Sequence, residues 1–173
     1  YTTLFRSLTM KILVSFLLLL ASLSSWSFEL VSVQLQKGKK TTSSPVIIVP
    51  DSMNARTTHA LSVFQDALAK MKIPSFRIVP LSTYQSKEKS FSKTQKVFFG
   101  LTELSQTDAL QIKTDAQSLT LNGGPRKGLV NAVTTFFEDY LQCIVFSPTE
   151  FSFPAWNQSA SISIPNGIAR TET

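Results

Sequence analysis

The segment at residues 122–141 reads NGGPRKGLVNAVTTFFEDYL and indicates a turn followed by an amphipathic helix. In its second part, apolar side chains recur every three or four residues, which is the period of one helix face. Pro125 stands just before or within the first turn, where a missing N–H group does no harm. The residues sharing this face are Leu129, Val133, Phe136, Phe137, Tyr140 and Leu141. The pattern predicts a helix over residues 126–141.

The glycine-rich turn at residues 122–126 allows two interpretations. Backbone N–H groups ahead of a helix can hold an anion, but no Lys-Ser/Thr pair of a phosphate-binding loop follows. We favour a structural turn in which glycine supplies a positive φ. Arg126 and Lys127 are the candidates for an anion contact or for a contact with a neighbouring domain.

A second helix is indicated upstream, before Pro74. Asp51, Ser52 and Asn54 can each accept a hydrogen bond from a free backbone N–H at a helix start. The apolar stripe that follows consists of Thr57, Ala60, Leu61, Phe64, Leu68 and Met71. Pro74 cannot continue the helix.

Seven short segments have strand character. Some alternate apolar and polar residues, and others are β-branched or aromatic runs bounded by proline or glycine. They lie at residues 31–35, 46–49, 76–79, 96–100, 109–113, 118–121 and 144–146. With the two helices they predict an α+β fold: a mixed sheet of about seven strands with both amphipathic helices packed on one face. The polar stretch at 82–95 predicts a mobile surface loop, and residues 166–173 predict a disordered tail.

The N-terminal region has the pattern of an export signal. Lys11 follows Met10, then comes an apolar run of about ten residues and a group of serines ending at Ser27. This run is shorter than the roughly 20 residues that a membrane-spanning helix needs. We therefore expect residues 10–27 to be a signal peptide, residues 1–9 to be translated upstream sequence, and the protein to be exported without a stable membrane span.

Composition excludes several classes of function. The 173 residues contain 17 basic and 11 acidic residues, one histidine and one cysteine. A multi-histidine or cysteine-rich metal site is therefore impossible, and we expect no metal and no cofactor. Beyond residue 27, 15 basic and 11 acidic residues remain, a net charge of +4. The lysines stand without interleaved aromatic residues, so we expect no nucleic-acid partner.

The reactive residue types give no convergent pair. Glu138 and Asp139 are adjacent on the predicted helix and point about 100° apart. We interpret Asp51 as a helix-start residue, His59 as a surface or satisfied histidine, and Cys143 as a buried small hydrophobe. We therefore expect no catalytic residue in this chain.

One ordered set of motifs resembles a known family. It comprises an Asp-Ala turn at 115–116, SLTL at 118–121, NGGPRKGLVNAV at 122–133, FFEDYLQC at 136–143 and FSP at 146–148. The set is similar to the N-terminal accessory domain that precedes the (β/α)8 barrel in family 67 α-glucuronidases and family 20 β-N-acetylhexosaminidases. It is most similar to the version found in uncharacterised secreted bacterial proteins. The resemblance covers residues 29–165, and we assign residues 28–165 to this domain. Gln142 departs from it, where the family often has Gly, and so do Ile144 and Val145, where it tends to have Arg-Trp.

The resemblance implies a non-catalytic domain that supports a catalytic barrel in the same polypeptide, present here as a fragment or truncated frame. The family's active-site carboxylates lie in that barrel, so no catalytic residue carries over to this chain. The alternative is a free-standing extracellular carbohydrate-binding or envelope-associated module. In that case Phe151, Phe153 and Trp156 are the candidates to stack on sugar rings. A membrane-tethered envelope protein and an independent enzyme are further alternatives.

Overall fold

The computed structural model describes residues 27–36, 39–147, 150–153 and 161–173. Its centre is a six-stranded mixed sheet with the strand order β11-β6-β7-β5-β3-β4. The strands of this sheet are β3 (Val46–Val49), β4 (Arg77–Pro80), β5 (Lys96–Glu103), β6 (Leu110–Thr114), β7 (Ser118–Gly123) and β11 (Ala169–Glu172). Strands β4, β3, β5 and β7 are parallel, whereas β6 and β11 each run antiparallel to their neighbour. The predicted α+β class with a mixed sheet is confirmed.

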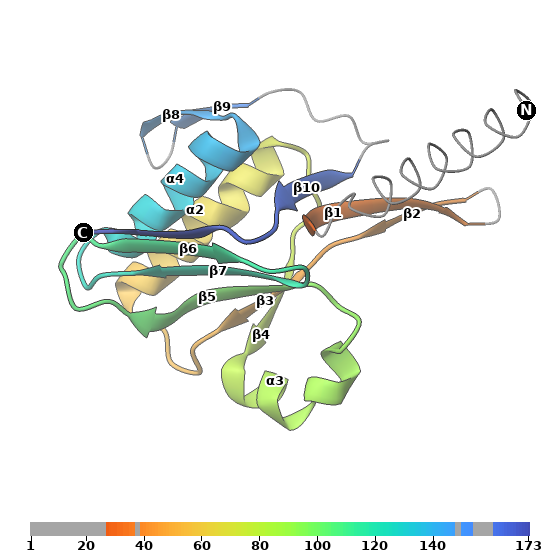
Figure 1. Ribbon diagram of the computed structural model, residues 1–173, viewed down its shortest axis with the longest axis horizontal. Helices are drawn as coiled ribbons and strands as arrows, with labels where there is room; N and C mark the ends of the chain where they lie inside the picture. The colour runs from red at the N-terminus through yellow and green to blue at the C-terminus, as the bar shows by residue number, and fades with distance from the viewer. Residues whose placement is uncertain (1–26, 37–38, 148–149, 154–160) are drawn as a thin grey trace, which may run out of the picture.

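The two long helices lie on one face of this sheet (Figure 1). They are α2 (Ala55–Lys70) and α4 (Gly128–Leu141), and both were expected from their apolar stripes. Phe64 of α2 contacts the rings of Phe136 and Phe137 of α4 and of Phe99 of β5, with centroids 5.6–6.3 Å apart. These four side chains are fully buried. Burying an aromatic ring of this size contributes about 1.5–3 kcal/mol, so this layer holds the main core.

The ends of both helices follow from particular residues. Asn54 caps α2 by accepting a hydrogen bond from the Thr57 N–H at 2.8 Å. Asp51 is not the helix-start residue that we expected: its carboxylate accepts from the N–H and hydroxyl of Ser82 instead. Helix α4 ends at Gln142, which has φ 55° and ψ 33° in the left-handed region. Glycine is the residue best suited to that backbone, so Gln142 holds a left-handed conformation that is uncommon for a residue with a side chain.

The expected surface loop at 82–95 is wrong. This stretch contains most of α3 (Leu81–Ser86) and a 3-10 helix, η1 (Glu88–Phe91). Both lie on the face of the sheet opposite α2 and α4, beside β3 and β4 (Figure 1). Tyr84 and Phe91 pack there around Val46, Ile48 and Val79. Tyr84 and Phe91 stand in two separate short helices, and two aromatic residues in a polar segment are too few to define an apolar stripe, so the sequence pattern could not show this second, smaller core.

The expected disordered tail at 166–173 is also wrong. Strand β11 pairs antiparallel with β6 at the edge of the main sheet, in register from Ala169↔Lys113 to Glu172↔Leu110. The Arg170 guanidinium binds the carboxylates of Asp139 on α4 and of Glu172. Edge pairing uses backbone groups, which no side-chain pattern reveals.

Two smaller sheets complete the described residues. Strand β1 (Ser27–Gln36) pairs with β2 (Lys39–Ser43) and β10 (Ile162–Pro165). Strands β8 (Ile144–Ser147) and β9 (Glu150–Ser152) form a hairpin against α4, on the side away from the main sheet (Figure 1). The expected signal peptide lies outside the described residues, apart from Ser27. No helix among the described residues is long and apolar enough to cross a membrane.

Candidate functional site

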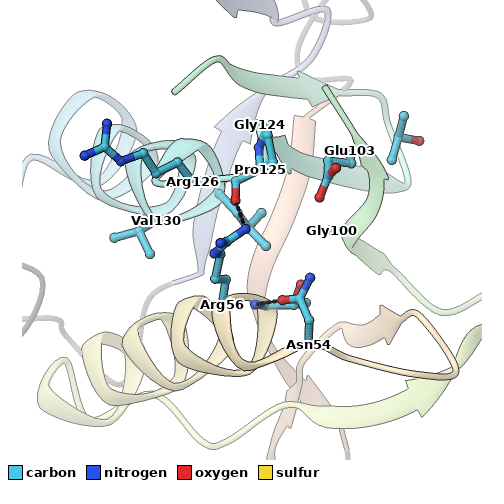
Figure 2. Close-up of a pocket in the computed structure, with 12 residues that line it drawn as sticks. Asn54, Arg56, Gly100, Glu103, Gly124, Pro125, Arg126 and Val130 are labelled. Carbon is cyan, nitrogen blue, oxygen red and sulfur yellow. Dashed lines mark hydrogen bonds between the residues drawn. The ribbon is translucent and has the colours of Figure 1, made fainter. Parts of the chain in front are cut away.

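The topology of the main sheet marks one place for a ligand. Strand β3 lies between β4 and β5. After β3 the chain continues through α2 to β4 on one side of β3, whereas after β5 it continues to β6 and β7 on the opposite side of the sheet. Open α/β sheets bind ligands in the crevice outside the carboxyl ends of strands where connections diverge in this way. A pocket occupies this position, between the start of α2, the end of β5 and the turn into α4 (Figure 2). We call it the carboxyl-end pocket.

The carboxyl-end pocket is crossed by a direct protein contact. The Arg56 guanidinium, in the first turn of α2, donates a hydrogen bond to the carbonyl oxygen of Pro125 (Figure 2). Glu103 at the end of β5 supplies the one carboxylate among the lining residues. The free volume is about 40 Å³. A buried water needs about 10–15 Å³ by this kind of measure, whereas small-molecule sites span roughly 300–1,000 Å³. The pocket therefore holds a few waters but no sugar ring.

Close backbone contacts explain the glycines at this pocket. A Cβ atom on Gly123 would lie 1.9 Å from the Leu129 nitrogen, and one on Gly124 would lie 1.8 Å from the Gln106 carbonyl oxygen. The structural interpretation of the turn thus rests on close approach, not on the positive φ that we expected. Among the described glycines, a positive φ is found at Gly100 and Gly167.

The two candidate cationic contacts have different positions. Arg126 lines the carboxyl-end pocket, but its side chain extends away from the Arg56–Pro125 contact (Figure 2). Lys127 is the N-cap residue of α4, and its backbone N–H donates to the Asp108 carboxylate at 3.2 Å. Sequence reasoning missed Arg56, because a single arginine in a first helical turn carries no motif.

Of the three candidate stacking residues, Phe153 is the one whose side chain the structure describes. Phe153 packs edge-on against Phe137 at 6.5 Å, so it contacts the main core. Phe151 lies in β9, but its side chain is outside the described part of the structure, as is Trp156. A shared stacking surface for these three rings stays a prediction.

The other residues with reactive side chains are buried, exposed or paired with another side chain. Cys143 is buried, as expected, and burial together with the nearby charge of Glu138 raises the pKa of its thiol to about 11. His59 is exposed on α2. Asp139 is exposed and paired with Arg170. Among the described residues, no three histidine, cysteine or acidic side chains are grouped closely enough to hold a metal ion.

A second hollow lies at the opposite end of β5 and β7. It is an open depression of about 500 Å³, which we call the amino-end depression. The starts of β5 and β7 line it, together with the β6–β7 turn, one residue of α3 and Asn166. Asp115, Ala116 and Ser118 belong to motifs that the resemblance used, but the sequence predicted no site there.

No family model, curated protein or solved structure matches this chain.

Proposed function

We propose that this chain is a non-catalytic accessory domain of an exported carbohydrate-active protein, in which it supports a catalytic (β/α)8 barrel of the same polypeptide. The observation that carries the proposal is the state of the carboxyl-end pocket. The place where such a sheet ordinarily binds a substrate is filled by protein, because Arg56 contacts Pro125 across it and about 40 Å³ is left free.

The chemistry of this pocket also argues against glycoside hydrolysis within it. That reaction usually uses two carboxyl groups about 5–9.5 Å apart across the substrate. Glu103 has no second carboxylate among the residues that line the pocket. A catalytic role would therefore belong to another part of the polypeptide.

The hairpin β8–β9 offers a surface for the supported barrel. Ile144 and Phe146 alternate along β8 and are 59% and 68% exposed, the two largest exposures among the large hydrophobic residues described. Val145, between them, is half-buried and packs towards the core. Exposed apolar side chains gathered on one strand face mark an interaction surface. The resembled family tends to have Arg-Trp at the positions of Ile144 and Val145, so this chain lacks any barrel contact that such a pair would make, and the exposed Ile144 and Phe146 are what the hairpin offers instead.

The mass of the native product tests this proposal. An antibody raised against this domain would detect the product in extracts of the source cells. We expect a band several-fold heavier than the 19.2 kDa of this chain, because a (β/α)8 barrel alone typically has about 250 residues. A native band at or below 19.2 kDa would contradict the proposal and favour the free-standing module.

A photo-crosslinking residue placed at Phe146 tests the docking surface in the same product. We expect peptides crosslinked to a segment outside residues 27–173. The matched control is the same residue at Lys89, which is exposed on η1 at the opposite face of the sheet. Equal crosslinking from both positions would remove β8 as the docking surface.

A further inference from the structure

Two Asn-Gly pairs occur in the sequence, Asn122-Gly123 and Asn166-Gly167, and the fold places them in opposite surroundings. In such a pair the glycine backbone nitrogen can attack the side-chain carbonyl carbon of asparagine, because glycine has no side chain to obstruct the ring that forms and its backbone adopts many conformations. The peptide group must first rotate out of its folded geometry. Tertiary structure therefore decides whether either pair reacts.

The pair Asn122-Gly123 is held inside the main sheet. Asn122 is 4% exposed. Its side-chain oxygen accepts a hydrogen bond from the Thr102 N–H at 3.2 Å, and its side-chain amide donates to the Gln111 side chain at 3.0 Å. Both residues of the pair lie in β7, which is paired with β5 on one side and with β6 on the other. Rotation of this peptide group would require β7 to part from both neighbours, which is close to global unfolding.

The pair Asn166-Gly167 forms an exposed turn between β10 and β11. The Gly167 N–H lies against the Asn166 side chain and donates to its oxygen at 2.8 Å. The nitrogen that would attack is therefore already beside the carboxamide. Gly167 has φ +79°, and no atom beyond its chain neighbours lies within 4 Å of the position that a Cβ would take. The turn thus leaves open space on that side of the glycine.

One contact opposes the reaction in this turn. The Gly167 N–H also donates to the Thr114 carbonyl oxygen at 3.1 Å, and that bond must break before the nitrogen can lose its proton. An exposed turn opens at a small fraction of the global free energy of unfolding, whereas the centre of a sheet opens only near the global value. The reactive state is therefore far more accessible to Asn166 than to Asn122.

We propose that Asn166 deamidates spontaneously in the folded protein and that this loosens the attachment of β11, whereas the sheet protects Asn122. The Gly167 nitrogen forms a bond to Cγ of Asn166, the bond from Cγ to Nδ2 breaks, and the proton of the Gly167 N–H leaves with Nδ2 as ammonia. Water then opens the cyclic imide. Opening at Cγ gives aspartate, and opening at the backbone carbonyl carbon gives isoaspartate. The reaction does not depend on the accessory role proposed above.

The isoaspartate product changes the connection between β10 and β11. Its main chain runs through the side-chain carbon, so the backbone becomes one carbon longer. Thr114 of β6 contacts the chain on both sides of the turn, because its hydroxyl donates to the Pro165 carbonyl oxygen at 2.7 Å and accepts from the Ile168 N–H at 3.1 Å. These contacts set the register of β11 on β6. A longer backbone cannot keep both, so β11 is held less firmly.

Peptide mapping of the aged full chain tests the site. The folded protein would be kept at mildly alkaline pH and body temperature, digested with trypsin and analysed by mass spectrometry. Trypsin places Asn122 in the peptide 114–126 and Asn166 in the peptide 128–170. Fragmentation then assigns the change to Asn166 or to another asparagine of the second peptide. A fresh sample corrects for deamidation during digestion.

We expect Asn166 to deamidate roughly ten-fold faster than Asn122, or more, in the folded protein. In guanidinium chloride the two rates should agree within about three-fold, since glycine follows asparagine in both pairs and no fold protects either. Similar rates at the two pairs in the folded protein would overturn the inference. So would a folded chain in which Asn166 stays intact while both pairs react in guanidinium chloride.

Hydrogen exchange of the aged protein tests the effect on β11. The isoaspartate form would be separated from the unmodified form by ion-exchange chromatography, because it carries one more negative charge. The backbone amides of Ala169–Glu172 should exchange several-fold faster in the isoaspartate form, and those of β3 should not change. Asn166→Asp is the matched control, since it adds the charge without lengthening the chain, and its β11 should exchange like that of the unmodified protein. Equal protection of β11 in the isoaspartate and unmodified forms would overturn the loosening.

Discussion

The two ends of β5 and β7 differ in how tightly the chain closes them. At the carboxyl end, Gly123 and Gly124 let backbone segments approach so closely that a Cβ atom would overlap them, and Arg56 bridges the remaining gap. At the amino end, Lys96 is 8% exposed, and its ammonium reaches an open depression that the Asp115 carboxylate also lines. The usual ligand position of an open α/β sheet is therefore closed here, and the opposite end is open.

The two ends of the sheet therefore differ in packing: the carboxyl end is tightly packed and the amino end is open. Glycines that permit close approach stabilise the fold and leave no room for a ligand. At the open end, a side chain can change without displacing packed backbone. Substitutions at the carboxyl end should therefore be destabilising, and substitutions at the amino end should be mild.

The largest expected effect is that of Gly124→Ala. The new methyl group would lie 1.8 Å from the Gln106 carbonyl oxygen, which is backbone and cannot rotate away. We expect a loss of about 3 kcal/mol or more in the free energy of unfolding. For a domain of this size, this corresponds to a fall in Tm of roughly 6–12 °C, measured by thermal unfolding.

Gly167→Ala is the matched control for that substitution. Gly167 lies next to Asn166 in the turn at the amino end, and it has φ +79° with no atom within 4 Å of an added Cβ. Left-handed backbone alone costs a non-glycine residue about 1–2 kcal/mol. A loss at Gly167 as large as that at Gly124 would show that the carboxyl end is not the more tightly packed end.

Arg56→Met should have a smaller effect than either glycine substitution. It removes the hydrogen bond to the Pro125 carbonyl oxygen, an exposed contact worth about 1 kcal/mol. A fall in Tm of roughly 2–4 °C is expected. Arg126→Met is the control, since the Arg126 side chain makes no hydrogen bond or ion pair to the described residues, and it should leave Tm unchanged. Equal effects of the two substitutions would contradict the bridging role of Arg56.

Lys96→Met should not destabilise the protein. The methionine side chain fills a similar volume, and the ammonium that it removes reaches the open depression rather than an enclosed position. We expect thermal unfolding to show a change in Tm of less than about 3 °C. A fall of more than about 3 °C would show that Lys96 contributes to stability and would contradict the looser packing of the amino end.

The smallest effect concerns pH and Asp115. Burial acts to raise the pKa of Asp115, but the hydrogen bonds from Ser118 and Gln117 and the charge of Lys96 outweigh it, so the pKa lies below its usual value. A carboxyl group with a lowered pKa in the folded state stabilises the protein above its unfolded pKa, near 4. That contribution is lost as the pH falls through the lower, folded value.

Thermal unfolding between pH 6 and pH 3 measures this contribution. Asp115→Asn should make the fall in Tm over that range shallower, by an amount equivalent to about 0.5 kcal/mol after solvent screening. Asp51→Asn is the counterpart at the carboxyl end of β3. The hydroxyl and N–H of Ser82 lower the pKa of Asp51, so the sign should be the same, with a smaller change because Asp51 is fully exposed. A steeper fall in the Asp115 variant would contradict the assigned sign.

Side-chain periodicity was enough to predict the main layer of the fold. The stripes of α2 and α4 predicted both helices, and Phe64, Phe136 and Phe137 from those stripes lie in the core. The short apolar runs predicted the strands β3, β5, β6 and β7. These features are local, because each segment carries its own alternation of apolar and polar residues.

Contacts between distant segments were not predictable in this way. Strand β11 is held by backbone pairing with β6 and by the Arg170–Asp139 ion pair, which joins residues 31 positions apart. Helix α3 is short and mostly polar, and Tyr84 finds its partners only when β3, β4 and β5 are side by side. Neither feature leaves a period in the sequence.

The sequence by itself determined that this chain forms an α+β domain with two amphipathic helices on one face of a mixed sheet, because apolar periodicity is a local property of each segment. It also showed glycines at the turn into α4. Only the tertiary structure decided what those glycines do and which end of the sheet is open. At the carboxyl end, the Arg56–Pro125 hydrogen bond and the approach of Gln106 to Gly124 close the pocket, whereas at the amino end Lys96 lines an open depression. These contacts form only when segments that are far apart in the chain pack together.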